Sequence, residues 1–323
     1  TIPWNASGRY ILGLELDFID RMPNPEDAAT VFLIDTQDDN KIIRLDKTHG
    51  WNPQQGTMFY WNPNNDDIRF FLNDRDVETG QVFSVLYDIQ KRKRVREYRF
   101  HDASIGNGGV AFDGSSFMAI NYGRLARLRL VTGYPGALDF SAEDIAPTND
   151  GIFAVDIATG KKRLLVSYKQ MDDALKKHGM HTPHTGLFVN HTLVNRDSNR
   201  LYFFARANWT RMPYEKETGE GINVPFTVNL DGSNLMPHKQ HIGGHPEWDE
   251  GPVMIGSVKQ DGQRQQIRYD INTQQIIGRL GDAKMFPKPD GDVALSPDGN
   301  WFVNGYKPNK ESTENFFAVY HRP

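Results

Sequence analysis

Short apolar runs alternate with polar turns along the whole chain, and one form of run recurs six times. Each copy follows a polar turn and soon reaches aromatic or β-branched residues. A short apolar run bounded by turn residues is typical of a β-strand. The six copies are GRYILGLEL (8–16), DIRFFLND (67–74), SSFMAINY (115–122), NRLYFFARA (199–207), GPVMIGSV (251–258) and GNWFVNGY (299–306).

Further predicted strands surround each run, which we name strand B. A strand A precedes it, and a strand C follows it and usually ends in an aspartate-containing turn of the DxxTG or LDG kind, which is typical of β-hairpins. Several units continue into a basic strand D. The order predicts six A-B-C-D units, of which the last lacks strand D. The basic strands include KIIRL (41–45), KKRLLVS (161–167) and IIGRL (276–280).

A tandem array of four-stranded units predicts a β-propeller, in which the units are blades around a central channel. We therefore expect an all-β fold and a single domain over residues 1–323, with six blades, or seven if terminal sequence is missing. A β-sandwich, the alternative, accounts badly for six similar units. Within 168–179, Met171 and Leu175 on one side and Gly179 at the end predict one short amphipathic helix.

Composition narrows the class of protein. With 323 residues, 38% of them hydrophobic, the chain can bury a substantial core. The absence of cysteine excludes disulfides, thiolate nucleophiles and thiolate-bound zinc. A net charge of −4 argues against a nucleic-acid-binding protein, and no apolar run is long enough to span a membrane. The basic segment 91–96 alternates around apolar positions, which indicates a solvated outer strand.

Most histidines lie in the connections that lead into a strand A. In a propeller these connections share one face, so we expect the histidines to gather around one mouth of the channel. Histidine titrates near neutrality and is a common metal ligand, so this gathering predicts a chemical site. His191 lies within strand A of unit four, where alternation places it on one side with Val189 and Leu193. The histidines of the connections are His49, His101, His178, His181, His184, His238, His241 and His245.

Three residues are candidate metal ligands. His245 opens strand A of unit five, and Asp292 occupies the corresponding place in unit six. With His241 they form a nitrogen and oxygen set that suits Mn²⁺, Ca²⁺ or Zn²⁺. No compact metal motif is present, and hydrogen-bonded core histidines or solvent-facing loop histidines remain the alternative.

Positive charge is expected near the same mouth. Long B–C connections (17–30, 123–150 and 207–224) emerge on the face that holds the histidines, and such loops commonly build binding sites. Their arginines favour an anionic ligand, because guanidinium pairs bidentately with carboxylate, phosphate or sulfate. Surface ion pairs are the alternative. The candidate substrate contacts are Arg124, Arg127, Trp51, Gln55 and Trp209.

Two sets of segments carry a resemblance to known propellers. IPWNASGRY, HPEW and ALSPDGNWFVNGY resemble the SPDG-type strands of TolB-like propellers. FVNHTLVNRDSNRLYFFARANW and GGHPEWDEGPVMIGS resemble the histidine-bearing blades of oligogalacturonate-lyase-like propellers, and the propeller-fold ulvan lyases are similar. His191 and His245 match histidine positions of that family, whereas Asp292 stands where a third histidine is expected.

The resemblance implies a polysaccharide lyase that cleaves an anionic, uronate-containing oligo- or polysaccharide by β-elimination. It implies a metal ion or an arginine opposite the uronate carboxylate, and a bacterial-type periplasmic or secreted location. On this basis we expect His191 or His184 as the base, Arg206 and Arg124 as the carboxylate partners, Tyr122 or Tyr306 as the acid, and His245, His241 and Asp292 as metal ligands.

Two other functions remain open at this stage. A propeller can bind a glycan or a protein on the same face without catalysis. A glycoside hydrolase on this fold needs two carboxylates, and acids are plentiful although no pair stands out. The GxSxG, P-loop, GxGxxG and HExxH motifs are absent, so the chemistries that depend on them are set aside.

Overall fold

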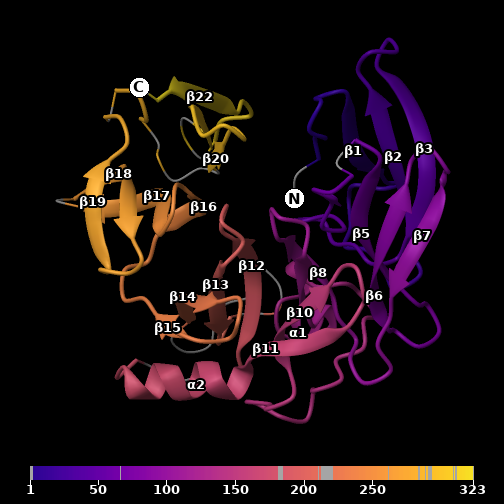
Figure 1. The fold of residues 1–323 in the computed structure, drawn as a ribbon, viewed down its shortest axis with the longest axis horizontal. Coiled ribbons are helices and arrows are strands. Elements are labelled where there is room, and N and C mark those ends of the chain that lie inside the picture. The colour runs from indigo at the N-terminus through magenta and orange to yellow at the C-terminus, as the bar shows by residue number, and fades with distance from the viewer. Residues whose placement is uncertain are drawn as a thin grey trace.

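The chain folds into six antiparallel β-sheets that follow one another along the sequence (Figure 1). Each sheet is one blade of a β-propeller, so the expected all-β propeller is confirmed. A computed structural model describes residues 3–65, 67–180, 185–209, 211, 221–260, 262–282, 284–287, 289, 293–307, 309 and 311–322.

The strands of the six blades alternate with short turns. Blade 1 contains β1 (Tyr10–Glu15), β2 (Ala29–Asp35) and β3 (Lys41–Thr48). Blade 2 contains β4 (Tyr60–Trp61), β5 (Arg69–Arg75), β6 (Val82–Asp88) and β7 (Lys93–Tyr98). Blade 3 contains β8 (Gly106–Val110), β9 (Ser116–Ile120), β10 (Gly151–Asp156) and β11 (Lys162–Ser167). Blade 4 contains β12 (Phe188–Val194), β13 (Arg200–Ala207), β14 (Ile222–Asn229) and β15 (Met236–Pro237). Blade 5 contains β16 (Gly243–Trp248), β17 (Val253–Gln260), β18 (Gln263–Asp270) and β19 (Gln275–Arg279), and blade 6 contains β20 (Val293–Leu295), β21 (Trp301–Tyr306) and β22 (Phe316–His321).

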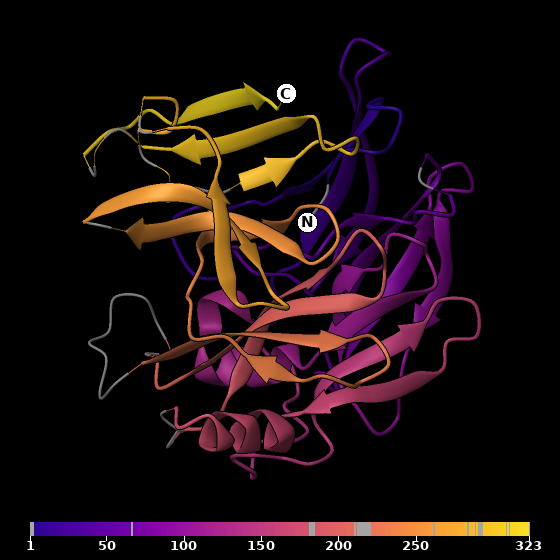
Figure 2. The ribbon, with the colours of Figure 1, turned by 60° about the vertical axis from the view of Figure 1, so that its left-hand side comes forward.

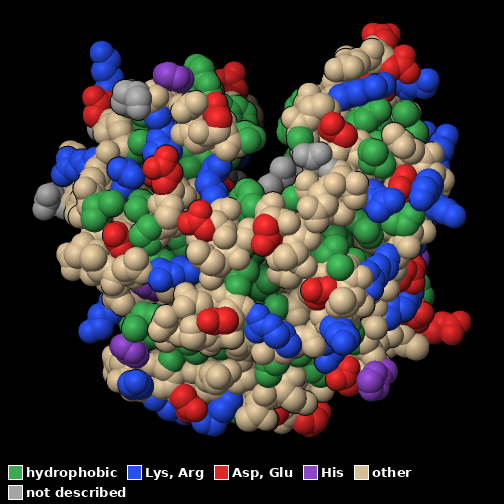
Figure 3. Space-filling model, viewed as in Figure 1, with side chains coloured by type: hydrophobic (Ala, Val, Ile, Leu, Met, Phe, Trp, Pro, Cys, Tyr) green, Lys and Arg blue, Asp and Glu red, His purple; other side chains and the backbone are tan. Residues whose placement is uncertain are grey.

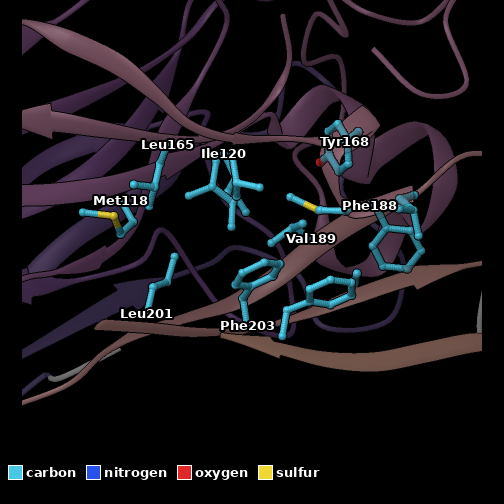
Figure 4. Packing of buried hydrophobic residues seen from close by; sticks show 14 of the residues in the cluster. Met118, Ile120, Leu165, Tyr168, Phe188, Val189, Leu201 and Phe203 are labelled. Atoms are coloured by element: carbon cyan, nitrogen blue, oxygen red, sulfur yellow. The ribbon is translucent and has the colours of Figure 1, made fainter. Parts of the chain in front are cut away.

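The blades are held together by apolar side chains that meet face to face. Five buried clusters fill the five interfaces between successive blades, from blades 1 and 2 to blades 5 and 6. Figure 4 shows the cluster between blades 3 and 4, in which Met118 and Ile120 of β9 lie near Leu201 and Phe203 of β13. Because middle blades are covered on both faces, their central strands are rich in apolar residues and largely buried, as in β6, where every residue is buried, including Ser84 and Asp88.

The innermost strands approach one another closely around the axis. Gly109 of β8 lies so near β12 that a Cβ atom on it would be 2.1 Å from the Thr192 carbonyl oxygen. Only glycine allows this contact between blades 3 and 4. On blade 1 the innermost position is taken by residues 3–5, where Trp4 forms a bridge to Ile11 of β1.

The ring is open between blade 6 and blade 1. These two blades lie on either side of a gap in Figure 1, and Figure 3 shows a cleft at the same place. In the described part of the chain no apolar cluster bridges them. Among the described residues blade 6 has three strands and no strand D, as expected, and Figure 2 shows β22 at its outer edge.

The expected helix over 168–179 is confirmed as α2 (Tyr168–Lys177). It begins at a capping box, in which the Ser167 hydroxyl accepts from the Gln170 backbone N–H and the Gln170 side chain accepts from the Ser167 N–H. Met171 and Leu175 are buried. No described helix has the length and apolar character needed to cross a membrane.

The sequence analysis missed a second helix in the B–C connection of blade 3. This connection holds α1 (Tyr122–Leu128) and a 3₁₀ turn, η1 (Leu130–Thr132). Asn121 caps α1 by accepting from the Arg124 N–H at 2.9 Å. The N-cap was the readable signal, but about two turns of helix are too short to show a hydrophobic period. The solvated outer strand expected at 91–96 is confirmed by β7.

Candidate functional site

One position on the innermost strand differs in chemistry from blade to blade. This position lies three residues before the last residue of strand A that pairs with strand B. The residues there are Met58 in blade 2, Asn107 in blade 3, His191 in blade 4 and His245 in blade 5. The backbone is left-handed at three of them, with φ of 54° at Met58, 58° at His191 and 49° at His245. A left-handed residue that is not glycine is uncommon, and in a strand it accompanies a bulge that re-aims the side chain.

A bulge lies next to His191, whose side chain still opposes those of Asn190 and Thr192, as the alternation of a strand predicts. The register between β12 and β13 shifts between Asn190 and Leu193. Asn190 and Thr192 are buried, whereas His191 is half-buried. His191 therefore turns away from its neighbours and faces the next blade. The bulge itself was not readable from the sequence, because no glycine marks the kink.

The bulges bring two imidazole rings together. The ring centroids of His191 and His245 are 4.9 Å apart at an interplanar angle of 53°. The ring of Phe204 on β13 contacts two imidazoles. Its centroid is 5.9 Å from that of His191 and 5.6 Å from that of His241. The imidazoles of His191 and His241 thus lie against the Phe204 ring, and the imidazole of His245 lies against that of His191.

Arg206 supplies the positive charge beside these rings. It lies two residues after Phe204 on β13, and its guanidinium carbon is 4.8 Å from the Phe204 centroid and 4.8 Å from the Trp209 centroid. Its Nε donates to the side-chain oxygen of Asn223 at 2.8 Å. In the described part of the chain Arg206 forms no ion pair with a carboxylate. A half-buried guanidinium with a neutral partner is suited to an anionic ligand.

Burial and nearby positive charge favour the neutral imidazole at His191 and at His241, next to the cationic guanidinium of Arg206. Burial, followed by repulsion from Arg206 and His245, lowers the pKa of His191 well below 6.5. Burial and then Arg206 also lower the pKa of His241. Burial lowers the pKa of Arg206 to about 10, so this side chain stays protonated at neutral pH. A neutral imidazole can accept a proton, which a charged one cannot.

A buried acid on β16 and a phenol on β4 are close enough to interact electrostatically. Glu247 follows His245 by two residues on β16, and burial raises the pKa of its carboxyl. Burial, and then the charge of Glu247, raises the pKa of Tyr60 on β4. The sequence analysis missed Tyr60, Phe204 and Asn223. The only available signal for Phe204 was its spacing of two residues from Arg206 in FFAR.

Several predicted site residues lie inside the fold and away from this site. Arg124 is fully buried, and its guanidinium donates to the carbonyl oxygens of Leu187 and Ile145 at 2.6 and 2.7 Å. The Tyr122 hydroxyl is buried and donates to the Asn107 carbonyl at 2.8 Å. The Trp51 indole donates to the Asp27 carbonyl at 2.9 Å. These side chains stabilise the loops of blades 1 to 4.

The remaining predicted residues are accessible but separate. Arg127 forms an ion pair with Asp139 at 2.7 Å. Gln55 lies in the turn that leads into blade 2, and its backbone N–H donates to the Asn52 side chain. Tyr306 ends β21 and stacks on Phe316, with centroids 5.7 Å apart. Trp209 is the only one of the proposed aromatic substrate contacts that lies against Arg206 in the described structure.

The expected gathering of eight histidines does not hold. The side chain of His101 is 99% exposed on the outside of the molecule. His238 is buried between β14 and β18, where its ring nitrogens lie 2.8 Å from the Thr227 hydroxyl and 3.1 Å from the Tyr269 hydroxyl. His178 ends α2. Connections on one face of the propeller can lie near its axis or near its outer edge. Histidines on the same face therefore need not contact one another. His181, His184, Asp292 and most of 207–224 lie outside the described residues.

Comparison with known proteins supports the fold. No protein-family model matches the chain, and no curated protein matches it in sequence. Among solved structures, an oligogalacturonate lyase in complex with manganese matches 97% of this chain and 72% of its own, with a TM-score of 0.56 and 14% identity. The chain shares the β-propeller fold of that lyase.

Two other solved structures have the same character. The hydrazine synthase of Kuenenia stuttgartiensis matches 99% of this chain and 82% of its own, with a TM-score of 0.52 and 13% identity. A TolB-like protein of Agrobacterium tumefaciens matches 99% of this chain and 88% of its own, with a TM-score of 0.47 and 14% identity. The lyase and the hydrazine synthase, at 14% and 13% identity, share the fold with this chain, so the resemblance expected from the sequence is confirmed at the level of the fold, and the function has to be argued from the site.

Proposed function

We propose that this protein is a polysaccharide lyase that cleaves a uronate-containing glycan by β-elimination at the His191–His245 pair. The observation that carries the proposal is a neutral imidazole, His191, placed among a second imidazole and the guanidinium of Arg206. β-Elimination needs a base that can take a carbon-bound proton and a positive charge for the carboxylate next to that carbon. Both are present within one small region of blades 4 and 5.

Arg206 would bind the uronate carboxylate. Its Nε is held by Asn223, which leaves the other edge of the planar guanidinium for two parallel hydrogen bonds to a carboxylate. When the proton leaves the neighbouring carbon, negative charge spreads onto the carboxylate oxygens. A fixed cation at that place stabilises the charge in the transition state more than in the ground state.

His191 would then act as the base and His245 as the acid. The proton on the carbon next to the carboxylate moves to His191, the electron pair forms a carbon–carbon double bond, and the bond to the leaving oxygen breaks. His245, which is accessible to solvent, delivers a proton to that oxygen. The reaction consumes no water and changes no oxidation state overall. His245 replaces Tyr122 in this role because the Tyr122 hydroxyl is engaged in the core.

The described residues do not fit a complete metal site. Their His, Asp and Glu side chains form no group of three that could hold an ion, and His191 and His245 together offer two ligands. A protein metal site commonly needs three or four ligands. We therefore derive no step through a metal ion. The polymeric substrate class accords with action outside the cytoplasm, so we include a periplasmic or secreted location in the proposal.

The test is to incubate the protein with pectate, ulvan and glycosaminoglycans and to follow the ultraviolet absorbance of the unsaturated product. We expect absorbance to rise with at least one of them. No rise with any substrate, with or without added divalent ions, would end the lyase proposal, and cleavage to saturated products would indicate a hydrolase.

A matched pair of variants separates catalysis from binding. His245→Asn should keep most of the glycan affinity and lose turnover, whereas a non-catalytic glycan-binding propeller would lose affinity instead. His101→Asn is the control, because that side chain is exposed and far from the site. Affinity is measured by calorimetry with an oligouronate, and turnover by the absorbance assay.

A further inference from the structure

The guanidinium of Arg206 contacts two aromatic rings and one amide. Its central carbon is 4.8 Å from the ring centroid of Phe204 and 4.8 Å from that of Trp209. Its Nε donates to the side-chain oxygen of Asn223 at 2.8 Å, so these three contacts are all with uncharged groups. An arginine side chain has many rotamers, and contacts that restrict it before a ligand binds lower the cost of binding.

Trp209 is anchored to the same strand that holds Arg206. The indole Nε1 donates to the Ile222 carbonyl at 3.0 Å, and the ring packs edge to face on Phe188 with centroids 6.2 Å apart. Ile222 and Asn223 are neighbours on β14. One pair of residues therefore holds the indole through its backbone and the guanidinium through its side chain.

A second cation lies over the same indole. Arg129 is the C-cap of α1, and its guanidinium carbon is 5.2 Å from the Trp209 centroid. Burial, and to a smaller extent the charge of Arg129, lowers the pKa of Arg206 to about 10. Repulsion between the two cations favours a displaced Arg206. The face of a tryptophan attracts a guanidinium, and the attraction is stronger where the group is removed from water, so the indole offsets that repulsion.

We propose that Trp209 is a positioning residue, which fixes the guanidinium of Arg206 so that its remaining edge meets the carboxylate of an anionic sugar. The identity of that anion, a uronate, rests on the proposed function, whereas the hold on Arg206 does not. Trp209 thus acts through Arg206, and it differs from the direct substrate contact expected from the sequence. Its one polar atom is bonded to the backbone, and its ring is covered by guanidinium groups.

The first experiment needs no ligand. In protein labelled with ¹⁵N-arginine, the Nε–H signal of Arg206 is assigned by its absence in Arg206→Lys. We expect this proton to be shifted by the two rings and to exchange slowly with water. Trp209→Leu should remove much of the shift and speed the exchange at least about fivefold, whereas Trp209→Phe, which keeps an aromatic face, should retain most of both effects.

The second experiment separates positioning from direct contact by a double-mutant cycle. Binding of an oligouronate is measured by calorimetry, and thermal unfolding shows that each variant is folded. Trp209→Leu should weaken binding about five- to thirtyfold in the wild-type background and less than about twofold in an Arg206→Gln background. An indole that stacks directly on the sugar would lose the same factor in both backgrounds.

Trp301→Leu is the matched control for the loss of an indole. Trp301 begins β21 on blade 6, and its side chain is 49% exposed. This variant should change neither the Arg206 signal nor the affinity for the oligouronate.

Two outcomes would overturn the proposal. They are an Arg206 signal that Trp209→Leu leaves unchanged, and equal losses of affinity in the two backgrounds. Failure of the proposed function has a different signature. The Arg206 signal would still respond to Trp209→Leu, while the wild type formed no unsaturated product or bound no oligouronate, so the hold on Arg206 would stand and the uronate would not.

Discussion

Met58 and His191 occupy the same kinked position on the innermost strands of blades 2 and 4, yet the Met58 side chain is buried in the core and the His191 side chain is half-buried. Met58 is 7% exposed and belongs to a buried apolar cluster. His191 is half-buried and faces His245. The backbone conformation is nearly the same, with φ of 54° and 58°. The comparison teaches that the kink belongs to the fold, and that the chemistry depends on which side chain a blade places on it.

The largest effect on kcat is expected when His191 of blade 4 is replaced by methionine, the residue at the equivalent position of blade 2. His191→Met keeps the kinked backbone and a side chain of similar size but removes the base. We expect kcat to fall by about 10²- to 10⁴-fold, with a small change in the melting temperature. The absorbance assay with an oligouronate measures the first and thermal unfolding the second. Full activity in this variant would remove His191 from the mechanism.

At Met58 we expect the opposite result: a substitution should lower the stability of the protein, because the side chain packs in the core and takes no part in the reaction. Met58→Ala removes a buried side chain from the cluster and is expected to lower the free energy of unfolding by about 2–5 kcal/mol. Met285→Ala, at a position that is 38% exposed, is the control and should change it by less than about 1 kcal/mol. Urea unfolding at pH 7 measures both. Similar losses in the two variants would contradict the comparison.

A third contrast concerns a histidine that is structural. His238 is buried between two hydroxyl groups, and burial, followed by the charge of Arg200, lowers its pKa from 6.5 to about 4. As pH falls below 6.5 the unfolded chain takes up a proton that the folded chain does not, so stability is lost between pH 6.5 and about 4 and not at higher pH. The expected loss is about 3 kcal/mol.

The control for this loss is His238→Gln, which removes the titrating group. Urea unfolding at pH 7 and pH 4 should show a decrease in the wild type that exceeds the decrease in the variant by about that amount. Other titrating groups are common to both proteins and cancel in the comparison. An equal decrease in both would show that His238 is not responsible.

The smallest expected effect comes from Arg206→Lys, which keeps the charge and removes the planar fork. Because lysine cannot pair bidentately with a carboxylate, kcat/KM should fall on the order of 10- to 100-fold. Arg127→Lys is the matched control, since Arg127 pairs with Asp139 away from the histidines. Equal losses in the two variants would mean that Arg206 does not contact the substrate.

The sequence predicted the blades well because their signal is local. Apolar runs, hairpin aspartates such as Asp88 and Asp156, and basic outer strands lie within a few residues of one another. The six units, the missing fourth strand of the last one and helix α2 followed directly.

The site was predicted only in part because its geometry depends on non-local contacts. The meeting of His191 with His245 depends on two bulges and on the packing of blade 4 against blade 5. The burial of Arg124 depends on carbonyl groups that lie far along the chain, such as that of Leu187. A residue pattern contains neither the kink at a histidine nor the distance between connections. Eight connection histidines were therefore expected to gather, whereas the ring contact in the described structure is between His191 and His245.

The gap between blades 6 and 1 also predicts the order in which the blades unfold locally. Blades 2 to 5 each lie between two neighbours. In the described structure the apolar packing of blade 6 is against blade 5 only, through a cluster of five buried residues, with hydrogen bonds from Arg196 of blade 4 to the carbonyls of Ser296 and Pro297. Units with few buried apolar contacts unfold locally before the rest of a protein. Amide protons of β20 to β22 should therefore exchange before those of β12 and β16, so that partial opening begins at the terminal blade while the imidazole pair stays assembled.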